Sequence, residues 1–298
     1  MQKINITSSD GYVLSALQGV PLTNSKGTVI LSSATCIKKE FYINFAEYLV
    51  EKGYVVLLYD YRGIGESAPA DLKNSDIYIH EWGTKDMNAV LNYVTSVFGT
   101  CQITWFGHSI GSQLMGFIEN SKVIQKAISL NAAVGYWKYF PFPKNIGIWM
   151  MWYVIGPLMI KIHGYGMMKK IGWGEDLTKN SILEWREWCI NKDYFMPCIR
   201  EKLKTDRFDK FEVPITALYM DDDYIANDIT VPLMMEFFPN AAREIKKIKV
   251  SDYTVEKAGH VDIFRKKFEY TLWPLLVEEI ENKSMDHPVE TRLVANYG

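Results

Sequence analysis

The first 133 residues alternate between short apolar segments rich in β-branched residues and longer amphipathic segments. The apolar segments are "GTVILSS" (27–33), "YVVLLYD" (54–60), "QITWF" (102–106) and "KAISLNAA" (126–133). The amphipathic segments between them, at 41–53, 84–99 and 112–121, have the apolar spacing of helices. Strands that alternate with helices usually pair in parallel, with helices on both faces. The sequence therefore predicts an α/β fold on a mostly parallel sheet.

Four further segments bring the expected number of strands to eight. "KINIT" and "YVLSALQG" flank Ser8-Ser9-Asp10-Gly11, which predicts a hairpin-like turn. "VPITALYM" (213–220) restores the strand–helix rhythm late in the chain. "EIKKIKV" (244–250) alternates Ile or Val with Lys, which is typical of a half-exposed edge strand. Helical patterns near 231–238 and 264–280 complete the core, and the tail from Ser284 is polar.

Residues 134–210 differ in composition from the rest of the chain. They hold six of the nine tryptophans and many of the methionines, with helical patterns and no clear strand. The simplest organisation is an α/β-core formed by 1–133 and 211–298, with 134–210 inserted as a helical lid. We expect the Trp and Met residues either to line the functional face of the lid or to form the core of the lid itself.

One run inside this insertion, "IGIWMMWYVIGPLMI" (146–160), carries no charge. It is shorter than the about 20 residues of a spanning helix, and Gly156-Pro157 interrupts it. We favour a buried or lid helix, then contact with a membrane surface, and we expect no stable membrane insertion. The N-terminus lacks the pattern of a secretory signal, and the four cysteines lack metal-type spacing. These features predict a soluble, cytoplasmic protein with free thiols.

The segment "WFGHSIGSQ" (105–113) places Ser109 in a G-x-S-x-G frame, between a predicted strand and a predicted helix. The frame alone arises by chance in about one chain in ten of this length. A nucleophile elbow also requires the flanking strand and helix, with an acid and a histidine later in the chain. Because the strand and helix are both predicted, we interpret Ser109 as a nucleophile rather than a loop serine.

The later chain supplies candidate partners in the required order. "YMDDDYIAND" follows the strand at 213–220 and offers Asp221, Asp222 and Asp223 as the acid. His260 is the one histidine placed after these acids and before the last helical segment. A histidine activates a serine hydroxyl by taking its proton, and a buried aspartate orients the imidazole. We interpret His108, next to Ser109, as a packing or elbow-support residue.

The oxyanion of such a reaction needs two backbone N–H donors. Ile110 follows the nucleophile and is expected to supply one. The loop after "VILSS" is expected to supply the other, from Thr35 or Cys36. The remaining histidines lack ligand spacing, and "YRGIGES" (61–67) lacks the lysine of a phosphate loop. We therefore expect no metal and no cofactor. The formal net charge of −2 gives no reason to expect nucleic acid.

These residues together resemble the α/β-hydrolase superfamily, through "DYRGIGES", "GHSIG", the late aspartates and "GH" before the last helix. Strings such as "SSATCIKKEFY" and "GYWKYFP" are similar to an uncharacterised bacterial group of predicted α/β hydrolases related to the serine-aminopeptidase-like (S33) hydrolases. The resemblance implies the α/β-hydrolase fold with an eight-stranded sheet, Ser109 as nucleophile and His260 as base. It favours Asp223 as the acid, with Asp222 second.

The sequence thus predicts a serine hydrolase that cleaves a hydrophobic or aromatic carboxylic ester through an acyl-enzyme. Trp137, Trp149 and Trp152 are candidates to line the substrate pocket, although they could equally form the lid's own core. A peptidase or amidase is the alternative activity, and a non-catalytic ligand-binding protein is the alternative class. The expected partner is a small-molecule ester, and an oligomer is left open.

Overall fold

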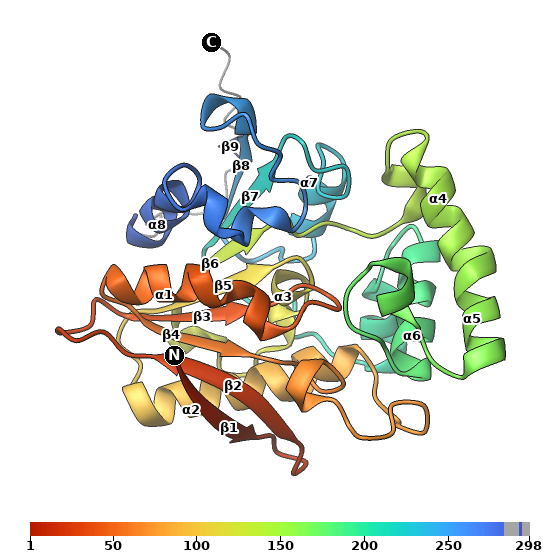
Figure 1. The fold of residues 1–298 in the computed structure, drawn as a ribbon, viewed down its shortest axis with the longest axis horizontal. Coiled ribbons are helices and arrows are strands. Elements are labelled where there is room, and N and C mark those ends of the chain that lie inside the picture. Colours follow the sequence, from red (N-terminus) through yellow and green to blue (C-terminus); the bar gives the residue numbers. More distant parts are fainter. Residues whose placement is uncertain (283–291, 294–298) are drawn as a thin grey trace.

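The structure is a computed structural model that describes residues 1–282 and 292–293. Its centre is a mixed sheet with the strand order β1-β2-β4-β3-β5-β6-β7-β8-β9 (Figure 1). The strands are β1 (Gln2–Thr7), β2 (Val13–Gly19), β3 (Thr28–Ser32), β4 (Val55–Tyr59), β5 (Ile103–His108), β6 (Ile124–Leu130), β7 (Ile215–Met220), β8 (Arg243–Ile248) and β9 (Arg292–Leu293). From β4 to β9 all neighbours pair in parallel, whereas β1 and β2 are antiparallel. All eight predicted strands are present, so the predicted fold class is confirmed, and the two-residue β9 is an addition at the edge of β8.

Helices cover both faces of the sheet because side chains of a buried strand alternate between the faces. In β3, Val29 and Leu31 pack in the cluster that contains α1 (Ile43–Glu51) and α8 (Trp273–Glu281). Ile30 packs instead in the cluster that contains α2 (Asn88–Phe98) and α7 (Thr230–Met235). Figure 1 shows α1 and α8 on one side of the sheet and α2 on the other. The continuous apolar strands of the sequence are therefore buried on both sides.

The helical insertion (residues 134–210) lies between β6 and β7. It contains α4 (Lys144–Met150), a π-helical turn (Met151–Ile155), α5 (Gly156–His163) and α6 (Lys179–Ile190), and α4 to α6 form a group beside the sheet (Figure 1). This segment contains one isolated antiparallel β-bridge, between Gly166 and Leu177. As predicted, the regular elements of residues 134–210 are helices, and no strand is assigned there.

The helix α4, the π-helical turn and α5 form one continuous helix, Lys144–His163. Among the described residues it is the one helix whose length and composition are sufficient to cross a membrane, a test that core helices of soluble proteins also pass. Only 28% of its most apolar stretch is buried. Of the buried or lid helix that we favoured from sequence, the structure shows a helix of the insertion that is largely exposed, because only one of its sides packs against the rest of the insertion.

Two helix boundaries differ from the sequence predictions. The helix expected to start at Thr84 already includes a π-helical turn over Trp82–Met87, and the Thr84 hydroxyl donates to the His80 carbonyl rather than capping a helix. The helix expected over 112–121 is short: α3 (Ile110–Gln113) is followed by a 3₁₀ turn (Met115–Phe117). Gly116 sits directly against the Phe208 ring, a tertiary contact that no local pattern reveals. The polar tail from Ser284 lies outside the described residues, except for β9.

Candidate active site

Ser109 occupies a strained turn between β5 and α3. Its φ of 53° and ψ of −115° are unusual for a residue with a side chain, and its backbone N–H donates to the Leu130 carbonyl of β6 at 2.9 Å. Such a turn points the side chain out of the end of the sheet, as a nucleophile elbow does. The structure therefore has the backbone geometry that the G-x-S-x-G frame predicts.

The two glycines of the frame are required by close backbone approach. A Cβ at Gly111 would overlap the Ser32 carbonyl oxygen of β3, and a Cβ at Gly107 would overlap Ser112. Because these two residues lie so close together, the Ser112 hydroxyl donates to the Gly107 carbonyl at 2.7 Å. The helix α3 consequently packs tightly enough to hold Ser109 in its strained conformation.

His260 and Asp223 lie next to Ser109, although 151 and 114 residues respectively separate them from it in the chain. The His260 Nε2 is 3.1 Å from the Ser109 Oγ, and the His260 Nδ1 is 2.6 Å from an Asp223 carboxylate oxygen. Asp223 is buried, and its second oxygen accepts from the Ile225 N–H at 2.8 Å. Because a carboxylate accepts, the His260 Nδ1 carries a proton and Nε2 is free to accept from the serine hydroxyl.

Asp221 and Asp222 bind other segments. The Asp221 carboxylate accepts from the Val250 N–H at 2.9 Å, just after β8. The Asp222 carboxylate accepts from both the Ala258 and Gly259 N–H groups at 2.9 Å. Asp222 therefore fixes the loop that carries His260, whereas Asp223 touches the imidazole itself.

His108 links three parts of the site, which sequence reasoning did not anticipate in detail. Its Nε2 lies 2.7 Å from the His260 carbonyl and must donate to it, so its Nδ1 accepts from the Tyr42 hydroxyl at 2.8 Å. The Tyr42 oxygen in turn accepts from the Ala34 N–H at 2.9 Å. Burial lowers the pKa of His108 to about 3, with the nearby His260 as a second cause. His108 is therefore neutral, and it connects the elbow, the His260 loop and the loop after β3.

Asn131 also supports the His260 loop. It follows β6 with a φ of 51°, and its amide donates to the Gly259 and His260 carbonyls at 3.2 and 3.0 Å. Its carbonyl oxygen accepts from the Met220 N–H at the end of β7. This role could not be predicted beyond the presence of a polar residue directly after a buried strand, because every partner of Asn131 is distant in the chain.

The loop after β3 carries Thr35 and Cys36, the candidates for the second oxyanion donor, while Ile110 follows β5. In the described part of the chain, no hydrogen bond engages the backbone N–H of Thr35, Cys36 or Ile110. The Ala34 N–H is occupied by Tyr42, so it is not a free donor. The Cys36 carbonyl accepts from the Glu175 N–H of the insertion at 2.6 Å, which anchors this loop from the other side. Thr35 and Cys36 both remain candidates for the second donor beside Ile110.

The three candidate pocket tryptophans lie at different depths of the insertion. Trp152 is buried and packs edge-on against Trp185, with ring centroids 5.0 Å apart. Trp149 is 38% exposed and stacks on Tyr153, whose ring also meets Trp137. Trp137 and Trp149 are thus brought together by Tyr153, while Trp152 points into the core of the insertion. Their role in a substrate pocket stays a prediction.

A cluster of three carboxylates near the site is occupied by an ammonium group. Oxygens of Glu40, Asp60 and Glu66 lie within 4.8 Å of one another, close enough for a metal site. All three bind the buried Nζ of Lys39, at 2.7 to 2.8 Å. The lysine supplies the positive charge that a metal ion would otherwise bring, so we interpret this cluster as a structural ion-pair network.

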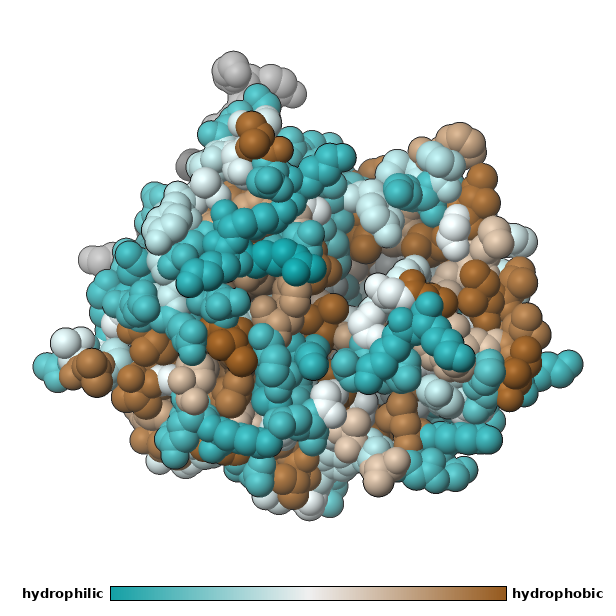
Figure 2. Space-filling view, in the orientation of Figure 1, coloured by the Kyte–Doolittle hydropathy of each residue, from teal (hydrophilic) through white to brown (hydrophobic). Residues whose placement is uncertain are grey.

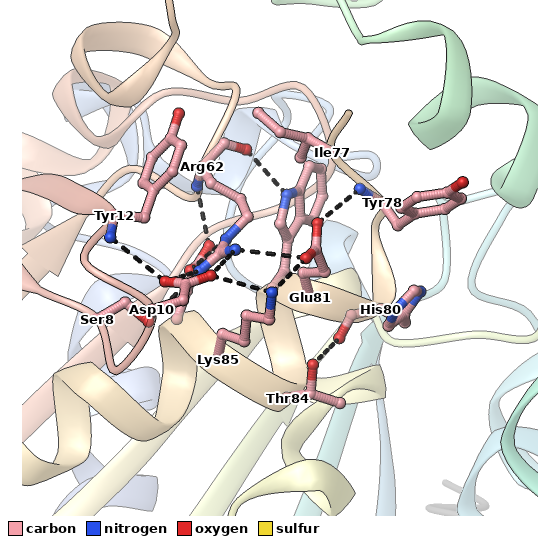
Figure 3. A network of polar contacts seen from close by, with 12 residues as sticks. Ser8, Asp10, Tyr12, Arg62, Ile77, Tyr78, His80, Glu81, Thr84 and Lys85 are labelled. Atoms are coloured by element: carbon pink, nitrogen blue, oxygen red, sulfur yellow. Dashed lines mark hydrogen bonds and ion pairs between the residues drawn. The ribbon is translucent and has the colours of Figure 1, made fainter. Parts of the chain in front are cut away.

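A second network fixes the loop after β4, the "YRGIGES" segment (Figure 3). The Arg62 guanidinium binds the Asp86 carboxylate at 2.7 Å and the Asp10 carboxylate of the β1–β2 turn at 2.8 Å. The Arg62 carbonyl accepts from the Trp82 indole, and Trp82 stacks on Tyr61 with ring centroids 4.7 Å apart. The predicted strand-ending loop is thus held rigidly.

The same loop reaches the site through Tyr61. The Tyr61 hydroxyl is 2.7 Å from the Ser32 hydroxyl, one residue before the loop that carries the oxyanion candidates. Through Trp82, which stacks on Tyr61 and donates to the Arg62 carbonyl, the network of Figure 3 is connected to the end of β3.

The strand order, the elbow after β5, the acid loop after β7 and the histidine loop after β8 define an α/β hydrolase. The profile of the family described as "Serine aminopeptidase, S33" matches residues 23–181, more than half of the chain. The chain belongs to this family of hydrolases. A comparison with curated proteins finds no match.

Solved structures agree with this assignment at the level of the fold. A soluble variant of a monoglyceride lipase from Saccharomyces cerevisiae has a TM-score of 0.65 at 16% identity, with 95% of each chain covered. An esterase of Pyrococcus furiosus has a TM-score of 0.58 at 15% identity, covering 94% of this chain and 88% of its own. A thermophilic esterase from Thermogutta terrifontis has a TM-score of 0.57 at 12% identity, covering 96% and 100%. At such identities the similarity concerns the fold alone.

Proposed function

We propose that this protein is a serine hydrolase that cleaves a carboxylic ester, with Ser109 as the nucleophile. The observation that carries the proposal is the continuous contact from Asp223 through His260 to Ser109, with distances of 2.6 and 3.1 Å. These distances suit hydrogen bonds that relay a proton between a hydroxyl and an imidazole. The strained backbone of Ser109 supports the same role.

In the proposed mechanism, the His260 Nε2 takes the Ser109 proton as Oγ attacks the ester carbonyl carbon. The resulting oxyanion accepts from the Ile110 N–H and from Thr35 or Cys36. The imidazolium then gives its proton to the leaving alkoxide, and the C–O bond breaks to leave an acyl-serine. Water repeats the sequence and releases the acid. Asp223 stabilises the imidazolium throughout, while Asp222, His108 and Asn131 hold the His260 loop.

An ester substrate is preferred because the structural relatives named above are esterases and a monoglyceride lipase. The tryptophans and methionines of the insertion favour a hydrophobic acyl or aromatic group. The family description supports a second candidate, cleavage of an amino-terminal peptide bond. A panel of p-nitrophenyl esters and amino-acid p-nitroanilides separates the two, because we expect measurable turnover with the esters only.

The nucleophile is tested with a fluorophosphonate probe, which labels activated serines. We expect one label per chain in the folded protein, none in Ser109→Ala, and a labelling rate at least about 10³-fold lower in His260→Ala. Thr35→Ala serves as a control and should be labelled like the wild type, since Thr35 is proposed to contribute only its backbone N–H. Labelling of Ser109→Ala at the wild-type rate, or no labelling of the folded wild type, would falsify the proposal.

A further inference from the structure

The helix Lys144–His163 presents an apolar face to solvent. Ile146, Met150, Val154, Leu158 and Ile162 follow one another at every fourth position, and each is between 44 and 62% exposed. The rings of Trp149 and Tyr153 extend this face along one side. Figure 2 shows hydrophobic side chains gathered along the outer edge of α4 and α5. We call these seven residues the outer face.

The π-helical turn reduces the winding of the outer face around the helix. In a regular α-helix, four residues turn the chain about 40° past a full turn, so a strict four-residue repeat would wind around the helix. The turn over Met151–Ile155 is wider than an α-helical turn and offsets this drift. The exposed residues consequently stay on one side, and the face is continuous over the length of the helix.

The opposite side of the helix is already fully packed. Ile148, Met151, Trp152 and Met159 are buried, and the Trp152 carbonyl accepts from the Arg186 Nε at 2.6 Å. The fold of the insertion thus accounts for the buried side and leaves the five aliphatic residues of the outer face exposed, while Tyr153 at its margin also contacts Trp137 and Arg186. A contiguous exposed apolar face of this kind marks an interaction surface.

Charge indicates the kind of partner. Residues 134–174 contain no Asp or Glu, although the whole chain has a formal net charge of −2. The same stretch contains five exposed lysines, which are Lys138, Lys144, Lys161, Lys169 and Lys170. Of these, only Lys169 forms an ion pair within residues 1–282, with Glu175. Within its own segment of the chain, the apolar outer face is therefore flanked by lysines and by no carboxylate.

We propose that the outer face lies flat on an anionic lipid surface, with the helix in the plane of the interface. An apolar helix face flanked by lysines, with aromatic rings beside it, is the pattern of helices that bind at lipid headgroups. A second copy of the chain fits less well, because a two-fold interface would bring the lysines of both copies together. Spanning is disfavoured since it would strip Trp152 from Trp185 and Arg186. The proposal goes beyond the proposed function and does not depend on Ser109.

Co-sedimentation with lipid vesicles tests the proposal, using the full chain with Ser109→Ala so that hydrolysis plays no part. We expect binding to vesicles of phosphatidylcholine mixed with phosphatidylglycerol, and weaker binding to phosphatidylcholine alone or at high salt. The variant Val154→Asp/Leu158→Asp should lower the partition coefficient at least about ten-fold. Lys161→Gln and Lys170→Gln should each lower it about five-fold.

Matched controls come from other surfaces. Val97→Asp introduces the same change on α2 at a valine that is 52% exposed, close to the 47% of Val154. Lys122→Gln removes an exposed lysine outside the insertion. Both controls should bind like the parent, and melting temperatures and circular dichroism verify that every variant is folded.

Two results would overturn the proposal. The first is unchanged vesicle binding in folded Val154→Asp/Leu158→Asp. The second is no binding of the parent to anionic vesicles. If the parent binds no vesicles but forms a lipid-free dimer, seen by analytical ultracentrifugation, that the same double variant dissociates, the outer face is assigned to a second copy of the chain.

Discussion

Asp221, Asp222 and Asp223 are adjacent in sequence, but their carboxylates bind three different segments. Asp221 binds the end of β8, Asp222 binds the loop before His260, and Asp223 binds the His260 imidazole. The three carboxylates are chemically identical, so sequence alone leaves the acid open. Their contacts distinguish Asp223, which touches the proposed base His260, from Asp221 and Asp222, which bind the backbone of the segment between β8 and His260.

The two neighbouring acids therefore respond differently to the same change. Asp223→Asn should lower kcat on a p-nitrophenyl ester about 10⁴-fold with little change in KM, because the amide no longer stabilises the imidazolium. Asp222→Asn should keep kcat within about ten-fold while lowering the melting temperature, because it weakens two hydrogen bonds to the backbone. Steady-state kinetics and thermal unfolding measure both. Equal kcat for Asp223→Asn and wild type would reassign the acid.

His108 makes the stability of the protein depend on pH. Burial lowers the pKa of His108 from 6.5 to about 3, so the unfolded chain binds the proton more readily than the folded chain does. The stabilisation is therefore complete above about pH 7 and is lost as the pH falls toward 3. From about pH 7 to about pH 5, wild type should lose about 2 kcal/mol more of its free energy of unfolding than His108→Gln. Urea unfolding at both pH values checks this, and parallel losses in both proteins would contradict it.

At the scale of elements, the strands were the most predictable feature of the chain. Continuous apolar runs mark strands buried on both faces, and "EIKKIKV" shows the half-exposed pattern expected of an edge. The shortness of α3 and the early start of the helix before α2 were not predicted, and both boundaries lie beside residues with tertiary contacts, Gly116 and Trp82, that local patterns do not reveal. The same limit applies to Asn131 and to the Tyr42–His108 link, whose partners are far away in sequence.

The network of Figure 3 joins the β1–β2 turn to the π-helical turn before α2, and its centre is an ion pair. Burial raises the pKa of the Asp86 carboxyl to about 7 even with the Arg62 guanidinium beside it, so Asp86 depends on this partner for its charge. Arg62→Met should lower the free energy of unfolding by about 3–5 kcal/mol, because it leaves a buried carboxyl without its partner. The double variant Arg62→Met/Asp86→Leu should recover part of the loss in urea unfolding. A double variant as unstable as the summed single variants would contradict a paired role.

At the scale of the whole molecule, the insertion and the core share one apolar interior. One continuous cluster of buried side chains includes Trp82 and Phe117 of the core together with Trp188 and Phe195 of the insertion. Polar contacts join the same parts: the Glu184 carboxylate of α6 binds His80 at 2.7 Å. An insertion held in this way is expected to fold with the sheet rather than as a separate lid domain.

This shared interior predicts a single unfolding transition. Tryptophan fluorescence reports mainly on the insertion, which holds six of the nine tryptophans, whereas far-UV circular dichroism reports on the whole chain. Because the buried cluster spans both parts, the two signals should give urea midpoints that agree within error. Phe195→Ala, at the junction where Phe195 packs on Phe237 of the core, should lower both midpoints together through a loss of about 3–5 kcal/mol. A fluorescence transition that precedes the dichroism transition would instead show an insertion that opens on its own, and would make the outer face part of a movable lid.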